Sequence, residues 1–355
     1  MNIIYGICSW GLGHATRSLP ILRRLFKEGH ELTIISHDRS LQLLKKELND
    51  QVTYIDLPDY PILVSENKEK FIAKSMVYWP LFIKRMESGL NYLKKIVERT
   101  TYDCIISDGR YDMYHKHIPS YFISHQIRIL NPLNIGIFET GSERFNEFFF
   151  RRFRDIIIPD YETDDFSGKL SHDFKRIDKN RLHYVGVLSD FSKKKKKKDI
   201  DYFISISGPE PQRSILENKL RSQVNDLSGS VVMTLGKTED QTQDFSDHIK
   251  IYDYLSKEQR EDLLNRSNIV ISRSGYSTIL DLAVIGCKAL MIPTPGQIEQ
   301  EYLAEYHMEK KTCHAVDQDN LNISADVALV NKTKGFNAKK SVEDAVENVM
   351  KIISI

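Results

Sequence analysis

Strand-like and helix-like segments alternate along this chain, and the alternation runs through it twice. Short apolar runs such as Ile3–Ile7 are followed by segments such as Ala15–Glu28, in which apolar side chains recur on one helical face. This alternation is typical of parallel sheets built from β-α-β units. Further strands are expected at Glu31–Ile35, Val52–Ile55, Asp103–Ile106, Ser120–Ile123 and Asp155–Ile158, and further helices at Leu41–Leu48 and Phe71–Arg99.

The same pattern restarts after a polar stretch that contains six consecutive lysines, Lys193–Lys198. Like charges in a row are hard to pack, so residues 189–200 are expected to form a solvated linker. A chain of 355 residues is too long for one ordinary α/β core. We therefore expect two Rossmann-like domains, 1–188 and 201–355, facing each other across a cleft, with the final helix able to pack back on the first. The later strands are expected at Tyr202–Ser205, Ser230–Thr234, Ile249–Ile251, Asn268–Ile271 and Ala289–Ile292, and the helices at Pro211–Val224, Lys257–Asn265, Thr278–Ile285, Ile298–His307 and Val342–Ile353.

Charge and cysteine usage narrow the class of protein. The formal net charge is +1, so no strong field favours nucleic acid as a partner. The first residues read as a strand, not as a signal peptide, and no apolar run has the length of a membrane span. We expect a cytoplasmic protein without a metal ion or cofactor. The four cysteines show no metal-site spacing and are expected to be buried free thiols in a reducing compartment: Cys8, Cys104, Cys287 and Cys313.

A glycine-containing turn follows the first predicted strand and opens a helix. Gly11 and Gly13 would let a ligand approach the backbone closely, and His14 stands at the helix N-terminus. The helix dipole there disfavours imidazolium, so a neutral His14 could accept a proton from an attacking hydroxyl. The alternative is a histidine that only caps its own helix. The turn lacks the third glycine of a dinucleotide fingerprint, and Arg17 stands in that region.

Other polar residues of the first half follow strands and are expected to line the cleft. There they would bind the acceptor, the molecule that carries the attacking hydroxyl. Asp108 is the alternative candidate for the base, with His14 then positioning the acceptor. The acceptor-binding candidates are Gly11, Gly13, Arg17, Arg110, His125 and Gln126.

The second half offers two strand-to-helix turns for a phosphate-containing ligand. After Tyr202–Ser205, Gly208 permits a tight turn, with Ser207 and Arg213 able to reach an anion. A plain structural turn is the alternative there. The segment Arg273–Asp281 is more specific, because a buried strand runs into a Ser/Gly turn and directly into a helix. Backbone N–H groups from Gly275 to Thr278 could cradle a diphosphate.

Polar side chains beside that turn complete a predicted donor pocket. Asp281 lies about one turn into the helix, where a carboxylate can bind ribose hydroxyls. Gln297, Gln300 and Glu301 cluster at the next helix start and suit the hydroxyls of a sugar. As an isolated motif, the same cluster reads as an ordinary solvated helix start. The remaining donor-binding candidates of these turns are Arg273, Ser274, Gly275, Ser277 and Thr278.

These motifs, together with Gly13-His14, resemble the MurG-like glycosyltransferases, most strongly from Ser205 to Tyr302. The resemblance implies a GT-B fold, a UDP-sugar bound to the second domain, and direct inverting displacement without metal. It implies ribose binding by Asp281, sugar binding by Gln300 and Glu301, and uracil beside Tyr254 and Leu255. The acceptor would be a glycan or a lipid-linked precursor of the cell envelope.

Departures from the family pattern indicate a bacterial branch distinct from the peptidoglycan enzyme. Ser207–Arg213 replaces the family's Gly-Gly-Ser-Gln-Gly turn, and Glu301 replaces the second glutamine of a pair. The second change argues against carrying over N-acetylglucosamine as the donor sugar, and we expect a UDP-linked hexose or N-acetylhexosamine. A UDP-sugar 2-epimerase of the same fold and a non-catalytic nucleotide-binding subunit are the alternatives. The epimerase needs several carboxylates around the sugar, and few candidates exist beyond Asp108 and Glu301.

One segment raises the question of a membrane surface. Phe145–Arg154 mixes aromatic and basic residues, which could bind an anionic surface at the inner face of the plasma membrane. The alternative is a buried helix face with arginines solvated around it.

Overall fold

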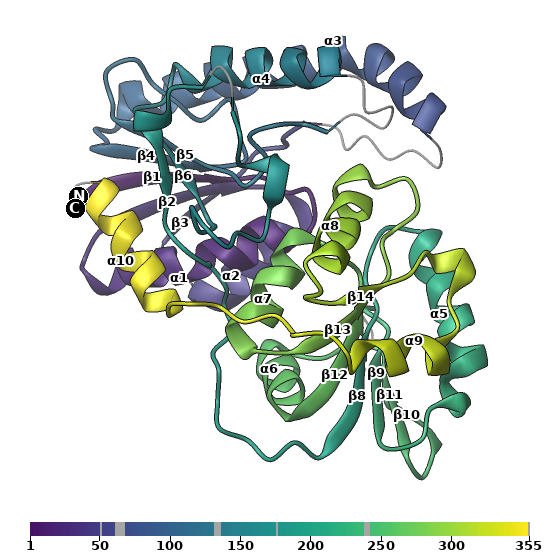
Figure 1. The fold of residues 1–355 in the computed structure, drawn as a ribbon. Coiled ribbons are helices and arrows are strands. Elements are labelled where there is room, and N and C mark those ends of the chain that lie inside the picture. Colours follow the sequence, from purple (N-terminus) through teal and green to yellow (C-terminus); the bar gives the residue numbers. More distant parts are fainter. Residues whose placement is uncertain (50–51, 61–67, 131–135, 175–176, 238–241, 354–355) are drawn as a thin grey trace. The chain divides into compact units, whose positions relative to one another are not determined.

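The computed structural model describes residues 1–49, 52–60, 68–130, 136–174, 177–237 and 242–353. The chain divides into two compact units, one formed by Met1–Asp190 with Lys340–Ile355 and the other by Phe191–Lys339 (Figure 1). Each unit is an α/β sandwich around its own seven-stranded sheet. Among the helices of the described ranges, none combines the length and apolarity needed to cross a membrane.

The sheet of the first unit is parallel throughout and has the order β3-β2-β1-β4-β5-β6-β7. Alternate residues of β1 point to opposite faces, so Ile3, Tyr5 and Ile7 join one core cluster while Ile4 joins another. The strands are β1 (Asn2–Ile7), β2 (Glu31–Ser36), β3 (Thr53–Asp56), β4 (Cys104–Asp108), β5 (Ser120–Ile123), β6 (Asp155–Ile158) and β7 (Leu182–Tyr184).

Helices cover both faces of this sheet. Figure 1 shows α3 and α4 along one face and α1, α2 and α10 along the other, in agreement with the two core clusters. The final helix therefore packs on the first unit, where Val346 and Val349 contact the core that also holds Leu22 of α1. The helices are α1 (Gly13–Lys27), α2 (Asp38–Leu48), α3 (Lys68–Arg99), α4 (Gly136–Phe150) and α10 (Val342–Ile352).

The sheet of the second unit has the order β10-β11-β9-β8-β12-β13-β14, parallel except for the antiparallel edge strand β10. Helices α5 and α9 cover one face through Leu216, Leu220 and Val327, whereas α6 packs against β8 and β12. The strands are β8 (Ile200–Ser205), β9 (Val231–Thr234), β10 (Thr242–Ser246), β11 (Ile249–Tyr252), β12 (Ser267–Ser272), β13 (Lys288–Met291) and β14 (His314–Ala315). The helices are α5 (Gln212–Gln223), α6 (Lys257–Arg266), α7 (Tyr276–Ile285), α8 (Ile298–Glu309) and α9 (Ile323–Val330).

Residues 192–199 of the lysine-rich stretch are exposed, as expected of a solvated linker, but their backbone is held on the second unit. Asp190 belongs to the first unit, and the chain from Phe191 onward belongs to the second. The Ser192 amide donates to Glu261 at 2.7 Å, and the Lys194 amide donates to Asn265 at 2.7 Å, so the backbone is fixed to α6. Lysine side chains tolerate this arrangement because Lys194 and Lys196 pair with Glu261 and Asp262 of the same helix.

Candidate functional site

The predicted acceptor-side residues of the first unit gather where three neighbouring strands end. In the register of the sheet, Ile7 of β1 lies beside Asp108 of β4, and Asp108 lies beside Ile123 of β5. The carboxyl ends of parallel strands are the usual ligand-binding edge of such a sheet. His14 and Arg17 reach this edge from the first turns of α1, and His125 reaches it from the loop after β5.

Asp108 is the hub of this cluster and is fully buried. It accepts hydrogen bonds from Arg17 Nε at 2.9 Å, from Ser18 Oγ at 2.8 Å and from a second nitrogen of Arg17. Burial opposes its ionisation, but the positive charge and hydrogen bonds of Arg17, with His14, outweigh burial and hold the pKa of Asp108 well below its usual range. Asp108 is therefore a carboxylate near neutrality, which suits orienting a histidine better than accepting a proton.

His14 lies between this buried charge and the surface. Its Nδ1 lies 2.7 Å from Asp108 Oδ1 and 2.9 Å from an Arg17 nitrogen, and its side chain is 20% exposed. A carboxylate only accepts, so the contact with Asp108 is a hydrogen bond only when Nδ1 carries the proton, which leaves Nε2 as the acceptor of the neutral ring. The Arg17 nitrogen only donates, so in this tautomer it is a close neighbour of Nδ1 and not its hydrogen-bond partner. This arrangement, in which a carboxylate orients the histidine, is that of a general base.

Gly109 is required for the position of the His14 ring, a role that the sequence analysis missed. Its φ is +76°, and a Cβ built on it would lie 2.8 Å from His14 Cε1 and 3.1 Å from His14 Nδ1. Only glycine leaves this space and adopts this φ at low cost. The positive φ is not visible in sequence, although the Asp-Gly pair at a strand end is a turn signal.

The remaining acceptor-binding candidates fall into two groups, those that belong to the Asp108 cluster and those that do not. Arg17 and His125 belong to the Asp108 cluster, since Arg17 Nη1 donates to His125 Nδ1 at 3.0 Å and both residues are buried. Gly11 is exposed with a φ of +77°, Gly13 begins α1, and Gln126 is half-buried.

The structure does not support the prediction that Arg110 binds the acceptor. It is fully buried and donates to Asp112 at 2.7 and 3.1 Å and to the Leu57 carbonyl at 2.8 Å, so it does not line an accessible surface.

In the second unit, the predicted donor residues surround the start of α7. Gly275 is the N-cap of this helix and supplies no side-chain cap, which suits backbone N–H groups that meet a ligand. Ser277, Thr278 and Asp281 are partly exposed, and their spacing places them on one side of the helix. Ser274, by contrast, is buried, and its hydroxyl donates to the Gln300 carbonyl at 2.7 Å.

Arg273 immediately precedes this turn and is only 1% exposed. Its guanidinium donates to four neutral oxygens: the carbonyls of Ile292, Pro293 and Gln212 at 3.2, 3.1 and 2.9 Å, and Gln318 Oε1 at 2.7 Å. No carboxylate of the described residues forms an ion pair with it. Burial lowers the pKa of Arg273 to about 10, so the group is still charged near neutrality. A buried, uncompensated cation favours an anionic ligand.

The predicted sugar-binding residues hold the turn that precedes α8. Gln300 Oε1 accepts from the Thr294 amide at 2.9 Å, Gln300 Nε2 donates to Gln297 Oε1 at 2.5 Å, and Glu301 Oε1 accepts from the Gly296 amide at 2.9 Å. All three side chains are half-buried and stay partly accessible. They therefore shape this turn as well as offering polar atoms to a sugar.

The turn after β8 is only partly as predicted. Ser207 and Gly208 are exposed, but Arg213 is held by Glu210 and by Glu217, with Nη1 3.1 Å from Glu217 Oε2. The prediction that Arg213 reaches an anion is therefore not supported, because two carboxylates already neutralise it. At the predicted uracil border, Tyr254 is 38% exposed, whereas Leu255 is buried.

Comparisons with known proteins identify the general activity. Residues 188–354 match the glycosyltransferase family 28 C-terminal domain, and residues 1–121 match the glycosyl transferase family 1 model. An uncharacterised glycosyltransferase of Methanosarcina mazei is 24% identical over 315 residues, covering 85% of this chain and 82% of the relative. The chain is a glycosyltransferase. A UDP-N-acetylglucosamine–N-acetylmuramyl-(pentapeptide) pyrophosphoryl-undecaprenol N-acetylglucosamine transferase of Rickettsia africae is 36% identical over 87 residues, 24% of this chain and 23% of the relative.

Solved structures show that this glycosyltransferase has the GT-B fold. The calicheamicin glycosyltransferase CalG4 superposes with a TM-score of 0.65 at 13% identity, covering 99% of this chain and 93% of that one. Acinetobacter baumannii MurG gives a TM-score of 0.58 at 12% identity, covering 100% and 99%. A UDP-GlcNAc 2-epimerase from Neisseria meningitidis gives 0.62 at 12% identity over the full length of both chains.

These relatives do not confirm the prediction that the chain belongs to a bacterial MurG-like branch. The match to the Rickettsia transferase spans 24% of the glycosyltransferase, whereas the Methanosarcina relative, which is archaeal, spans 85% of it.

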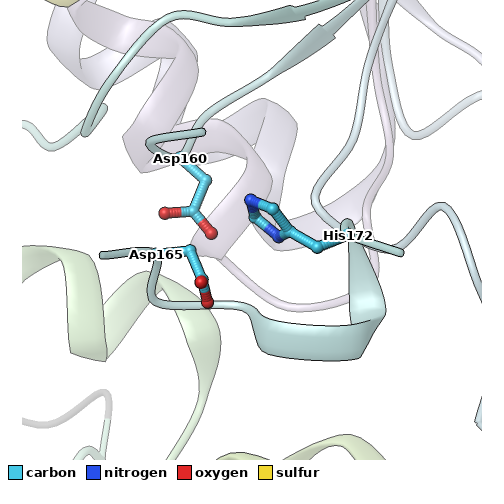
Figure 2. Close-up of side chains that lie close together, drawn as sticks. All are labelled: Asp160, Asp165 and His172. Carbon is cyan, nitrogen blue, oxygen red and sulfur yellow. The ribbon is translucent and has the colours of Figure 1, made fainter. Parts of the chain in front are cut away.

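One group of side chains in the glycosyltransferase has the composition of a metal site. Asp160, Asp165 and His172 lie close together (Figure 2), and their possible ligand atoms lie within 4.8 Å of one another. Asp160 already accepts from the amides of Tyr161 and Ser167 at 2.8 Å, Asp165 accepts from the Gly168 amide at 2.7 Å, and His172 Nε2 lies 3.0 Å from the Tyr161 carbonyl. These contacts use the atoms that would bind a metal, so the group holds the loop after β6 in shape.

Proposed function

We propose that the enzyme transfers a hexose or N-acetylhexosamine from a UDP-sugar to an acceptor hydroxyl, with inversion and without a metal ion. His14 is the general base, and Asp108 is a positioning residue that holds its ring. The contact between His14 Nδ1 and Asp108, with the ring edge partly exposed, carries this proposal, because it orients a proton acceptor at the ligand-binding edge of the sheet. A single displacement by a deprotonated hydroxyl inverts the anomeric centre.

The second unit supports a nucleoside-diphosphate donor. The uncapped start of α7 and the uncompensated charge of Arg273 both favour an anion. On expulsion of UDP, negative charge grows on the diphosphate, and preorganised N–H groups and a cation stabilise it without metal chemistry. Asp281 is partly exposed on the same side of α7 as Thr278, and in this proposal its carboxylate accepts hydrogen bonds from ribose hydroxyls.

The acceptor that we propose is a glycan or lipid-linked precursor met at an anionic membrane surface. The surface differs from the one that the sequence suggested, because Phe149, Phe150 and Phe153 are buried in the core. The exposed aromatic surface lies where α3 meets α4, with Trp79 at 49% and Phe148 at 57% exposure. Four exposed basic residues lie within six positions of these rings in the sequence, and one of them, Arg151, pairs with Glu147: Lys84, Arg85, Arg144 and Arg151.

The test is turnover of UDP-sugars with His14→Ala and Asp281→Ala variants. His14→Ala is expected to lower turnover about 10²–10⁴-fold with UDP affinity unchanged, because it removes the base and leaves the donor unit intact. Asp281→Ala is expected to weaken UDP binding, because ribose hydrogen bonds are lost. Unchanged turnover in His14→Ala contradicts the assigned base. Interconversion of UDP-sugars without any acceptor identifies a 2-epimerase instead.

A further inference from the structure

Two buried polar atoms of the second unit have no hydrogen-bond partner among the described residues, and they face the same point. They are Nε of Arg273 and Oγ1 of Thr294, and each residue is 1% exposed. A Cβ built on Gly208 would lie 3.8 Å from Arg273 Nε and 3.6 Å from Thr294 Oγ1. Buried donors are nearly always paired in folded proteins, so two unpaired ones at one point indicate a missing partner.

The sheet explains why these three residues meet. Ser272 at the end of β12 lies in register with Ser205 of β8 and Met291 of β13. Arg273, Gly208 and Thr294 follow these neighbouring strands by one to three residues. The Ile292 amide donates to the Ser272 carbonyl at 2.9 Å, which fixes the loop carrying Thr294 beside Arg273.

The chemistry of the two atoms defines the missing partner. Arg273 Nε can only donate, and its other nitrogens are held by the neutral oxygens described above, so the partner must be an acceptor. The guanidinium charge has no carboxylate partner among the described residues, so an anionic oxygen is favoured. Gly208 leaves the approach open because it has no side chain, and its φ of +112° disfavours any other residue.

We propose that Arg273 Nε and Thr294 Oγ1 form a buried oxyanion subsite beside Gly208, which binds one phosphate oxygen of the donor diphosphate. This inference rests on the proposed function and adds Thr294 to the donor site. The N-cap of α7, Gly275, stands two residues after Arg273, so the backbone N–H groups of that helix are placed to bind other oxygens of the same diphosphate. A water held by the same two atoms is the competing occupant.

The experiment compares UDP with uridine, its phosphate-free counterpart, in wild type, Thr294→Val and Thr294→Ser. UDP affinity is measured by isothermal titration and uridine affinity by ligand-observed NMR. Valine keeps the shape and removes the hydroxyl, whereas serine keeps the hydroxyl. Thr294→Val is expected to weaken UDP binding about ten- to a hundredfold and to leave uridine binding unchanged. The UDP affinity of Thr294→Ser is expected to stay within about threefold of that of wild type. Because the Thr294 hydroxyl has no partner among the described residues, its removal should not lower the melting temperature of ligand-free Thr294→Val.

A second variant tests the same point without touching Thr294. Gly208→Ala places a methyl group in front of both polar atoms, so it is expected to weaken UDP binding and to spare uridine. Unchanged UDP affinity in Thr294→Val overturns the subsite. Equal losses for UDP and uridine, with a lower melting temperature, indicate a structural water and overturn it too. Failure of wild type to bind UDP refutes the proposed function itself, and the subsite for its diphosphate with it.

Discussion

Replacing Asp108 by asparagine removes the buried negative charge that balances the Arg17 guanidinium and accepts the hydrogen bond of Ser18. Asp108 is fully buried and accepts hydrogen bonds from Arg17 Nε at 2.9 Å and from Ser18 Oγ at 2.8 Å. Arg17 itself is only 3% exposed. The variant leaves the Arg17 guanidinium buried without its counter-ion and turns an amide N–H₂ toward donors. Breaking a buried ion pair by removing one partner costs about 3–5 kcal/mol. That is a large share of the about 5–15 kcal/mol by which proteins are stable.

Tryptophan fluorescence measures this loss in the right part of the chain. The protein has two tryptophans, Trp10 and Trp79, and both lie in the first unit. Urea unfolding followed by their emission therefore reports the stability of the unit that contains Asp108. Ser36→Ala is a matched control, because Ser36 is equally buried but donates only to the Ile7 carbonyl, at 3.0 Å. A loss below about 1 kcal/mol in Asp108→Asn refutes the view that Asp108 compensates Arg17.

The pH dependence of the same measurement separates charge from packing. The folded-state pKa of Asp108 is held well below the unfolded value of about 3.9, so its stabilising effect is complete above that value and is lost as the pH falls toward the folded pKa. The stability difference between wild type and Asp108→Asn should be constant from about pH 7 to 5 and narrow below about pH 4. A difference that stays constant down to pH 2.5 indicates a packing defect and contradicts the electrostatic explanation.

Three further predictions test the site, the metal and the surface. Gly109→Ala should displace the His14 ring, because a Cβ lies 2.8 Å from His14 Cε1, and so lower turnover about 10²-fold while UDP affinity is retained; equal turnover contradicts a positioning role. Chelation by EDTA should leave turnover within about twofold, and a collapse that Mg²⁺ or Mn²⁺ restores refutes metal-independent departure of UDP. Co-sedimentation with anionic vesicles at low salt should fall in Trp79→Ser and Phe148→Ser, with neutral vesicles as the control; absence of binding by wild type ends the membrane proposal.

The strands and helices with strong periodicity were predictable, whereas short edge elements were not. The predicted strands of β1, β2, β5 and β6 match the structure to within one residue at each end. The structure also contains strands β7, β10 and β14 and helix α9, which the sequence analysis did not predict, and helix α4, of which it considered only a helix face within Phe145–Arg154. Strands β7 and β14 have three and two residues, too few for alternation to appear, and they form only because a neighbouring strand offers its edge.

The two arginines that follow strands show where sequence reasoning about the site stops. Arg110 follows Asp108 of β4 by two residues, and Arg273 directly follows Ser272 of β12; both stand next to serine or glycine and both were predicted to meet ligand. Both are buried to 1% exposure or less. Arg110 is paired with Asp112, a carboxylate two residues away that is already visible in the sequence. The charge of Arg110 is therefore neutralised within the fold.

Arg273, in contrast, is surrounded by carbonyls of Gln212, Ile292 and Pro293, residues 61, 19 and 20 positions away, and by the amide of Gln318. No pattern in the sequence around Arg273 predicts that all its partners are neutral oxygens. The same tertiary contacts direct Nε toward the point beside Gly208 that it shares with Thr294 Oγ1. Thr294 belongs to no motif that the sequence would reveal. A buried cation becomes a ligand-binding group only where the fold withholds its counter-ion, and that property belongs to the packed sheet and not to the sequence around the arginine.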